Sequence, residues 1–228
     1  NTENYTGFQQ SENITFKDCT LTGKFFSYGD MTFDTCKFYA PGSAYAAGSA
    51  DYSMWCYAGD ITYKDCNFVG AGKFLNVYNE GNTSVPWKIE LTGCTFTTSA
   101  PSKAAVNVKE TSGSNLLKYD VAITNCSTNG NFPEASKSDT LWVISDLVQV
   151  DGRTSAGTTG IAVTLDGKQM YPQAVAKIGE TSYADLAAAL QAAVAMNGDV
   201  KVEIVDDVNL KNAVWPEIVV DGYSHPLG

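Results

Sequence analysis

Apolar and polar residues alternate in a short segment that occurs five times along the chain. The copies are ITFKDCTL (14–21), MTFDTCKF (31–38), ITYKDCNF (61–68), IELTGCTF (89–96) and VAITNCST (121–128). Alternation with a period of two is typical of a strand with one buried face. The copies therefore predict strands whose buried pairs are Ile14/Phe16, Met31/Phe33, Ile61/Tyr63, Ile89/Leu91 and Val121/Ile123.

The spacing of the copies indicates a solenoid. Their cysteines lie 17, 30, 28 and 32 residues apart, which leaves room for about one coil with insertions. A hairpin meander needs shorter spacing, and a propeller blade needs four strands per unit. The repeats thus predict an all-β fold, a right-handed parallel β-helix in which like residues stack about 4.8 Å apart.

A second strand is predicted in each coil, between the cysteine segments. Its copies are KFFSY (24–28), MWCY (54–57), KFLNVY (73–78), AAVNVK (104–109) and LWVIS (141–145). Asn76 and Asn107 fall in matching places, and alignment on apolar neighbours puts Cys56 and Ser27 beside them. The alignment of Trp55 and Tyr57 with Leu75 and Val77 predicts that these two aromatic side chains point inward.

The turn before each repeated cysteine holds Asp18, Thr35, Asp65, Gly93 or Asn125, and Asp30 and Asp60 share a second position. Clustered aspartates are a feature of β-helix hydrolases, so one hypothesis gives these residues a catalytic role. Another is a lyase that uses Lys17 or Lys64 as its base. Aspartate is a common turn residue, and the interpretation favoured here is that the aspartates close the coil corners.

The six cysteines are Cys19, Cys36, Cys56, Cys66, Cys94 and Cys126. Five of them share one repeat phase, which favours a stack of free thiols over disulfides, because parallel Cβ vectors do not suit disulfide torsion. No Cys-x-x-Cys pair is present and the single histidine is His225, so no metal site and no cofactor are predicted. Cys56 is out of phase and is predicted to be an exposed or reactive thiol.

The tail has a different pattern. Around Asp151–Gly160 the composition shifts to turn residues, and a domain boundary is predicted that separates coils in 1–170 from a strand–helix–strand segment in 171–228. Thr181 or Ser182 is predicted to cap a helix with Leu186, Leu190 and Val194 on one face. A strand is predicted over 200–205.

Composition excludes several classes of function. The 228 residues carry a net charge of −10 and are 44% hydrophobic, so the chain is globular, and neither nucleic acid nor an anionic membrane surface is an expected partner. No apolar run reaches the roughly 18 residues of a membrane span, so no membrane insertion is predicted. The abundance of Thr, Ser, Asn, Gly and Tyr favours an extracellular, cell-surface location.

The tail AKIGETSYADLAAALQAAVAMNGDVKVEIVDDVNL (176–210) resembles the segment that opens β-helix modules in surface proteins of gut Gram-positive bacteria. The match comprises Gly179, Tyr183, Leu186, Ala189, Gly198, Asp199, Asp207 and Val208. The coils are similar to the pectate-lyase-like repeats of the same proteins, including GKFLNVYNE (72–80) and KAAVNVKE (103–110). In that group the helix precedes the coils, whereas here it follows them. The tail is therefore either a small α/β cap on its own coils or the start of a following module, and the second case implies tandem modules in a longer parent chain.

The resemblance implies an adhesin or an immunoglobulin-binding protein, since members of the group include both. The leading hypothesis is a non-catalytic module of a bacterial surface protein that binds host protein, immunoglobulin included, or glycan. Tyrosine and tryptophan are usual anchors in such sites, and the candidate binding residues are Tyr45, Tyr52, Tyr78 and Trp87. The alternatives are a passive stalk module and a polysaccharide lyase or glycoside hydrolase.

Overall fold

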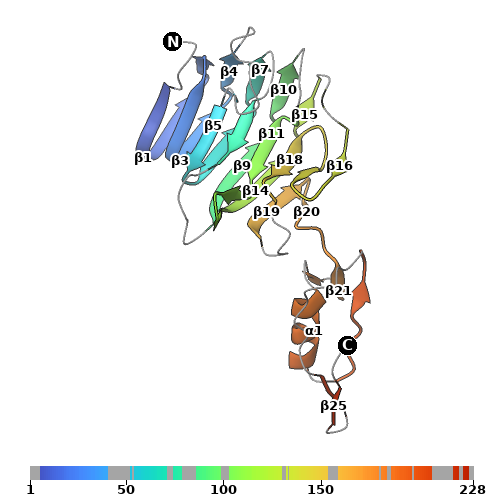
Figure 1. Ribbon diagram of the computed structural model, residues 1–228. Coiled ribbons are helices and arrows are strands. Elements are labelled where there is room, and N and C mark those ends of the chain that lie inside the picture. The colour runs from blue at the N-terminus through green and yellow to red at the C-terminus, as the bar shows by residue number, and fades with distance from the viewer. Residues whose placement is uncertain are drawn as a thin grey trace. The chain divides into compact units, whose positions relative to one another are not determined.

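The structure is a computed structural model (Figure 1). It describes residues 6–40, 52, 54–70, 74–78, 86–98, 103–129, 132, 134–153, 159–179, 181–183, 186–196, 198–206, 218–220 and 223–225. The chain forms two compact units, Asn1–Met170 and Tyr171–Gly228. The described residues are mostly in strands, with one α-helix, so the chain is all-β in class.

The first unit contains a curled sheet of 13 strands whose pairing is mostly parallel. The alternating segments supply β1 (Thr6–Lys17), β3 (Phe25–Asp34), β6 (Ile61–Lys64), β9 (Trp87–Thr92), β14 (Lys118–Thr124) and β19 (Gly160–Leu165). The second strand of each coil supplies β5 (Met54–Ala58), β8 (Leu75–Val77), β11 (Val106–Lys109) and β18 (Val148–Asp151). The long strand β3 pairs with β5 through its first half and with β6 through its second half, so the sheet forks there.

The strands that come directly after the in-phase cysteines in the sequence form a separate five-stranded parallel sheet. It consists of β2 (Thr20–Thr22), β4 (Lys37–Ala40), β7 (Asn67–Gly70), β10 (Thr95–Thr98) and β15 (Ser127–Thr128). A small hairpin, β12 (Thr111–Ser112) with β13 (Asn115–Leu116), projects from the coil that contains β11 and β14. Each complete coil thus contributes to both sheets.

In-register pairing places like residues above one another, as the repeats predicted. Phe33 pairs with Phe16 on one side and Tyr63 on the other, and both ring pairs are stacked with centroids 5.2 Å apart. In the second sheet the Phe38, Phe68 and Phe96 rings stack 4.7 Å apart. All the predicted buried pairs from Met31/Phe33 to Val121/Ile123 are buried; Ile14 and Phe16 are half-buried, because β1 pairs only with β3.

The corner between the two sheets repeats a left-handed backbone conformation. The residue before each of the five in-phase cysteines, and Asp166 in the last coil, has a φ between 49° and 66°. Aspartate, asparagine and glycine tolerate this conformation best, which explains five of the six corner residues; the exception is Thr35. The corner amides still bond the neighbouring coil, as the 2.8 Å bond from Asp65 N to Thr92 O shows. The interpretation of Asp18 and Asp65 as corner residues is confirmed.

The in-phase cysteines bond the carbonyls of these corners. All six thiols are free. Each of the five in-phase thiols lies 3.1–3.6 Å from the carbonyl oxygen two residues earlier. Cys66 Sγ also lies 3.3 Å from Phe33 O of the preceding coil. A small, weakly polar donor therefore fits a buried position that faces carbonyl groups.

Two predictions about the second strand are wrong, for one reason. Cys56 pairs with Val77 and Trp55 pairs with Asn76, so Cys56 points into the core and Trp55 points out. The sequence alignment was shifted by one residue, and a shift of one residue exchanges the faces of a strand. The predicted reactive thiol, Cys56, is fully buried and lies 3.0 Å from the Tyr63 hydroxyl, and this burial raises its pKa to about 12.

The segment at 141–145 is not the coil strand that the sequence predicted. β17 (Leu141–Val143) runs antiparallel to β18, and β16 (Ser136–Lys137) pairs with β17. The in-register strand of this coil is β18, whose Val148–Asp151 pairs with Val106–Lys109. β20 (Lys168–Tyr171) pairs with β19, so both strands of the last coil have a partner on their outer edge.

The second unit has its own small core. The strands β21 (Ala176–Ile178), β22 (Thr181–Tyr183) and β23 (Glu203–Ile204) form an antiparallel sheet, and α1 spans Leu186–Ala195. Ala176, Leu186 and Ala189 form the core. The predicted helix exists, and Leu186 and Leu190 of its predicted face pack on this core, but Val194 is 57% exposed and Ala189 is buried in its place. Thr181 and Ser182, predicted as caps, lie in β22. A hairpin of β24 (Ile218–Val220) and β25 (Tyr223–His225) ends the described chain.

The stacked core predicts a large cost for Ile89→Ala. Ile89 is fully buried and pairs with Ile61 and Val121 in the coils on either side, so truncation leaves a cavity that neither rigid neighbour fills. We expect the free energy of unfolding in urea to fall by about 2–5 kcal/mol. Glu90→Ala, on the exposed face of the same strand, serves as the control and should change it by less than about 0.5 kcal/mol. Equal losses for the two variants would contradict this core.

The buried position of Cys56 predicts selective thiol labelling. At pH 8 we expect a thiol reagent to modify the half-buried Cys19 and Cys126 of the folded chain and to reach Cys56 only after unfolding. The pKa of Cys56 is raised from 9.0 to about 12, so the neutral thiol favours the folded state below pH 9, and this contribution is lost as the pH rises toward 12. Mass spectrometry of the labelled peptides is the measurement. Labelling of folded Cys56 as fast as Cys126 would refute the inward orientation.

Candidate functional site

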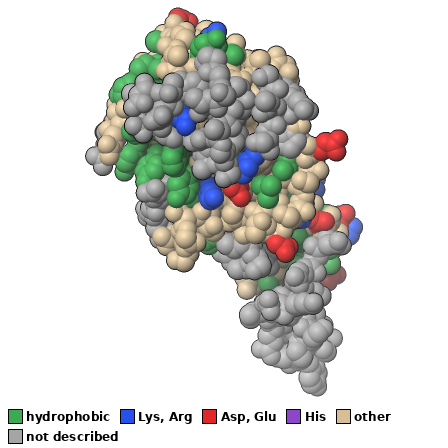
Figure 2. Space-filling model, turned by 45° about the horizontal axis from the view of Figure 1, so that its top comes forward, with side chains coloured by type: hydrophobic (Ala, Val, Ile, Leu, Met, Phe, Trp, Pro, Cys, Tyr) green, Lys and Arg blue, Asp and Glu red, His purple; other side chains and the backbone are tan. Residues whose placement is uncertain are grey.

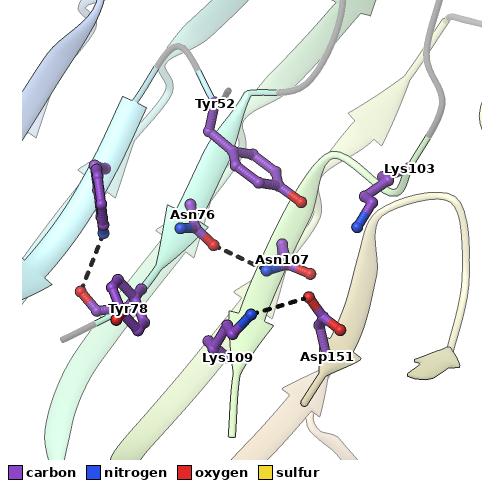
Figure 3. A pocket seen from close by; sticks show the side chains of 8 residues that line it. Tyr52, Asn76, Tyr78, Lys103, Asn107, Lys109 and Asp151 are labelled. Atoms are coloured by element: carbon purple, nitrogen blue, oxygen red, sulfur yellow. Dashed lines mark hydrogen bonds and ion pairs between the residues drawn. The ribbon is translucent and has the colours of Figure 1, made fainter. Parts of the chain in front are cut away.

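A groove lies on the outer surface of the strands β5, β8, β11 and β18 (Figure 3). Because Leu75, Val77, Val106 and Val108 face the core, the residues between them face outward. Register then places Asn76 beside Trp55 on one side and Asn107 on the other, with Gln149 next to Asn107. The floor of the groove thus contains one aromatic side chain and two amides, Trp55, Asn76 and Asn107, and the buried Gln149 continues their row.

The three amides form a hydrogen-bonded ladder. Gln149 Nε2 donates to Asn107 Oδ1 at 2.7 Å, and Asn107 Nδ2 donates to Asn76 Oδ1 at 2.8 Å. At the far end Gln149 Oε1 accepts a bond from the backbone N–H of Ala104 at 3.1 Å. A backbone N–H can only donate, so it fixes the orientation of Gln149 and, through it, of both asparagines.

The ladder therefore ends on a donor. Asn76 Oδ1 is occupied by Asn107, so its Nδ2 group points toward the Trp55 side, and Figure 3 shows this nitrogen turned away from Asn107. In the part of the chain that the structure describes, Asn76 Nδ2 donates to no other group. Since Asn76 is only 8% exposed, a ligand acceptor placed there bonds a donor that has little water to lose.

Aromatic side chains line one side of the groove. The Trp55 and Tyr78 rings are stacked with centroids 5.4 Å apart, and Trp55 Nε1 donates to Tyr78 O at 3.2 Å. The Tyr78 hydroxyl lies 3.1 Å from Ser112 Oγ in the β12–β13 hairpin. Tyr52 contributes a third ring, which Figure 3 shows above the amide row. Several contacts thus fix Trp55 and Tyr78 in place before any ligand arrives.

Charged side chains line the other side. Lys109 Nζ lies 3.6 Å from Asp151 Oδ2, and Asp151 Oδ1 accepts a 2.8 Å bond from the Gly152 N–H. Lys103 is half-buried and makes no ion pair with any residue that the structure describes. Two lysines against one aspartate give the groove a local positive charge within a chain of net charge −10. Figure 2 shows basic and acidic side chains close together on one face of the molecule.

The groove has the size and lining of a small-ligand site. Its volume is about 310 Å³, at the lower end of the range for ligand pockets. Flat aromatic faces bind the apolar faces of a ligand, while fixed amides and charges select its polar groups. This combination suits a sugar, which has an apolar ring face and a rim of hydroxyl groups.

The four residues predicted from sequence are placed differently by the structure. Tyr52 and Tyr78 line the groove, and Tyr52 is only 3% exposed. Trp87 lies in β9 opposite Tyr119 and does not line the groove. Tyr45 lies outside the described residues.

Six groove residues were not among the binding residues predicted from the sequence: Trp55, Asn76, Lys103, Asn107, Lys109 and Asp151. The phrases KFLNVYNE and KAAVNVKE carried the signal, because each places an asparagine between two inward apolar residues. That match correctly paired Asn76 with Asn107 but not with Cys56 or Ser27. The sequence does not predict Gln149 as part of this row, because it places the coil strand at 141–145 and not at β18.

The aspartates of the catalytic hypothesis accept hydrogen bonds from the backbone. Asp30 Oδ1 accepts from Asp60 N at 2.9 Å, and Asp60 Oδ1 accepts from Lys88 N at 2.9 Å. The hydrogen bond from the Thr35 hydroxyl, with smaller effects of Lys17 and Lys64, lowers the pKa of Asp34. A carboxylate held ionised in this way is a weak general base. Among the described residues, no three side chains of the metal-ligating types lie close enough to hold an ion.

Within the described helix no stretch is long and apolar enough to cross a membrane. The chain matches no family model, no curated protein and no solved structure.

Proposed function

We propose that this chain is a non-catalytic, glycan-binding module of an extracellular bacterial surface protein. The observation that carries the proposal is the groove, where stacked aromatic rings lie beside a polarised row of amides and a pair of lysines. Aromatic and amide side chains held in place by the fold lose little conformational entropy when a ligand binds. Such a site suits a sugar presented on a host surface.

The scaffold in this proposal is a right-handed parallel β-helix. Successive coils pair in parallel and in register in both sheets, and each coil turns through the same left-handed corner. Connections between parallel strands of one sheet are right-handed in about 98% of cases. A helix of this kind presents outward-facing rows of residues from neighbouring coils, and the groove is one of these rows.

A binding role accounts for more of the groove than the enzymatic alternative does. Among the described residues that line it, the one carboxylate is that of Asp151, which is paired with Lys109 and accepts from the Gly152 N–H. A lyase or hydrolase needs an acid–base pair within reach of the scissile bond. The passive stalk alternative gives no role to the aromatic platform or to the Asn76 amide donor, which no described residue bonds.

The test is a glycan array probed with the full 228-residue chain, followed by titration of the best ligand. We expect saturable binding that Trp55→Ala weakens about 30-fold, the loss that corresponds to about 2 kcal/mol at a buried aromatic hot spot. Tyr39→Ala is the control, because Tyr39 is a half-buried tyrosine of β4 in the other sheet, under Lys37.

Three other outcomes count against the proposal. Binding to no glycan in the presence of a folded chain favours the stalk. Binding to immunoglobulin that survives Trp55→Ala moves the site to a different surface and a protein partner. Shortened glycan products in the mixture indicate an enzyme.

A further inference from the structure

Two donors of the groove have no partner in the part of the chain described, Asn76 Nδ2 and Lys103 Nζ. The amide and carboxylate oxygens beside them already face donors: Asn76 Oδ1 accepts from Asn107, Asn107 Oδ1 accepts from Gln149, and the Asp151 oxygens face Lys109 and the Gly152 N–H. A ligand that supplies acceptors therefore complements these two donors.

These two donors are separated by one aromatic ring. In Figure 3 the Tyr52 ring lies between Asn76 on one side and Lys103 on the other, with Asn107 below it. A ligand stacked on the Tyr52 ring therefore meets an amide donor at one rim and an ammonium group at the other. The Lys109–Asp151 pair fixes one lysine, so Lys103 supplies a positive charge that no described residue pairs.

We propose, building on the glycan-binding function, that the groove selects an anionic sugar, whose carboxylate or sulfate oxygens bond Lys103 while a further oxygen accepts from Asn76 Nδ2. Hydrogen bonds between an ammonium group and an anionic oxygen are about twice as strong as neutral ones. They also discriminate, because a neutral sugar leaves the half-buried Lys103 without a counter-charge. The local positive charge draws an anion to this groove although the chain as a whole is acidic.

The probes are matched pairs that differ by the anion. Sialyllactose and a sulfated lactose are each compared with lactose, and digalacturonate is compared with its neutral disaccharide. We expect at least tenfold tighter binding to one of the anionic sugars than to its neutral partner, and that preference should shrink as salt is raised. The sugar preferred identifies the anion as a sialic acid, a uronic acid or a sulfate ester.

Two variants locate the anion contact. Lys103→Met keeps an unbranched side chain that is one atom shorter and removes its charge. It should lower affinity for the anionic sugar at least tenfold while changing affinity for the neutral partner less than twofold. Lys168→Met, in exposed β20, removes the same charge elsewhere and should change neither affinity.

Asn76→Asp tests the donor at the other rim. An aspartate oxygen still accepts from Asn107 Nδ2, so the ladder is kept, but the group that faces Trp55 becomes an acceptor. We expect anionic binding to be lost from a variant that retains its circular dichroism spectrum. Asn76→Ser, which restores a donor without charge, should recover part of the binding.

The outcomes separate the two proposals. Tight binding of neutral and anionic sugars alike, abolished by Trp55→Ala but not by Lys103→Met, overturns the anion selectivity and leaves glycan binding intact. Equal losses for both members of a pair in Lys103→Met overturn it as well. Absence of binding to every sugar by the folded chain overturns the glycan-binding function and the selectivity with it.

Discussion

In-register parallel pairing is the constraint on which the rest of this structure depends. Because each strand lies directly on the equivalent strand of the next coil, a residue is stable only if its side chain tolerates a similar one about 4.8 Å away. Aromatic rings tolerate this by stacking, and the Phe33–Tyr63 and Phe38–Phe68 pairs do so. The two stacks also meet edge to face, as Phe33 and Phe38 show with centroids 5.2 Å apart. The same rule governs the amides, the thiols and the left-handed corners.

Stacking explains why most of the fold was readable from the sequence. Five copies of one pattern fixed the buried face, and Met31, Ile61, Ile89 and Val121 indeed form one buried row. The predicted register is wrong where the repeat is short and irregular. β5 carries an extra residue relative to β3, since Ser27 pairs with Cys56 but Tyr28 pairs with Ala58. This bulge displaces Tyr57, and nothing in the letters MWCY distinguishes it from a regular strand.

The groove was less predictable than the fold, because it depends on that register. A register that places Trp55 in the core leaves the asparagine row without an aromatic neighbour, so the sequence favours tyrosines of the loops as binding residues. Lys103 and Asp151 come from segments 48 residues apart, and only the pairing of β11 with β18 brings those segments together. Pairing over that distance across an inserted antiparallel hairpin has no local signal in the sequence.

A stack of amides has a direction, and this accounts for where a binding site arises. Each amide donates to one neighbour and accepts from the other, so a ladder is satisfied inside and unsatisfied at its ends. One end is closed by a backbone group, the Ala104 N–H, which leaves the donor surplus at Asn76. A further asparagine in β5 would have moved that surplus one coil along. Trp55 occupies the position instead, so the row stops beside a ring that a ligand can stack on. The tryptophan at position 55 thus ends the ladder, leaves Asn76 Nδ2 without a partner among the described residues and supplies the apolar surface next to it.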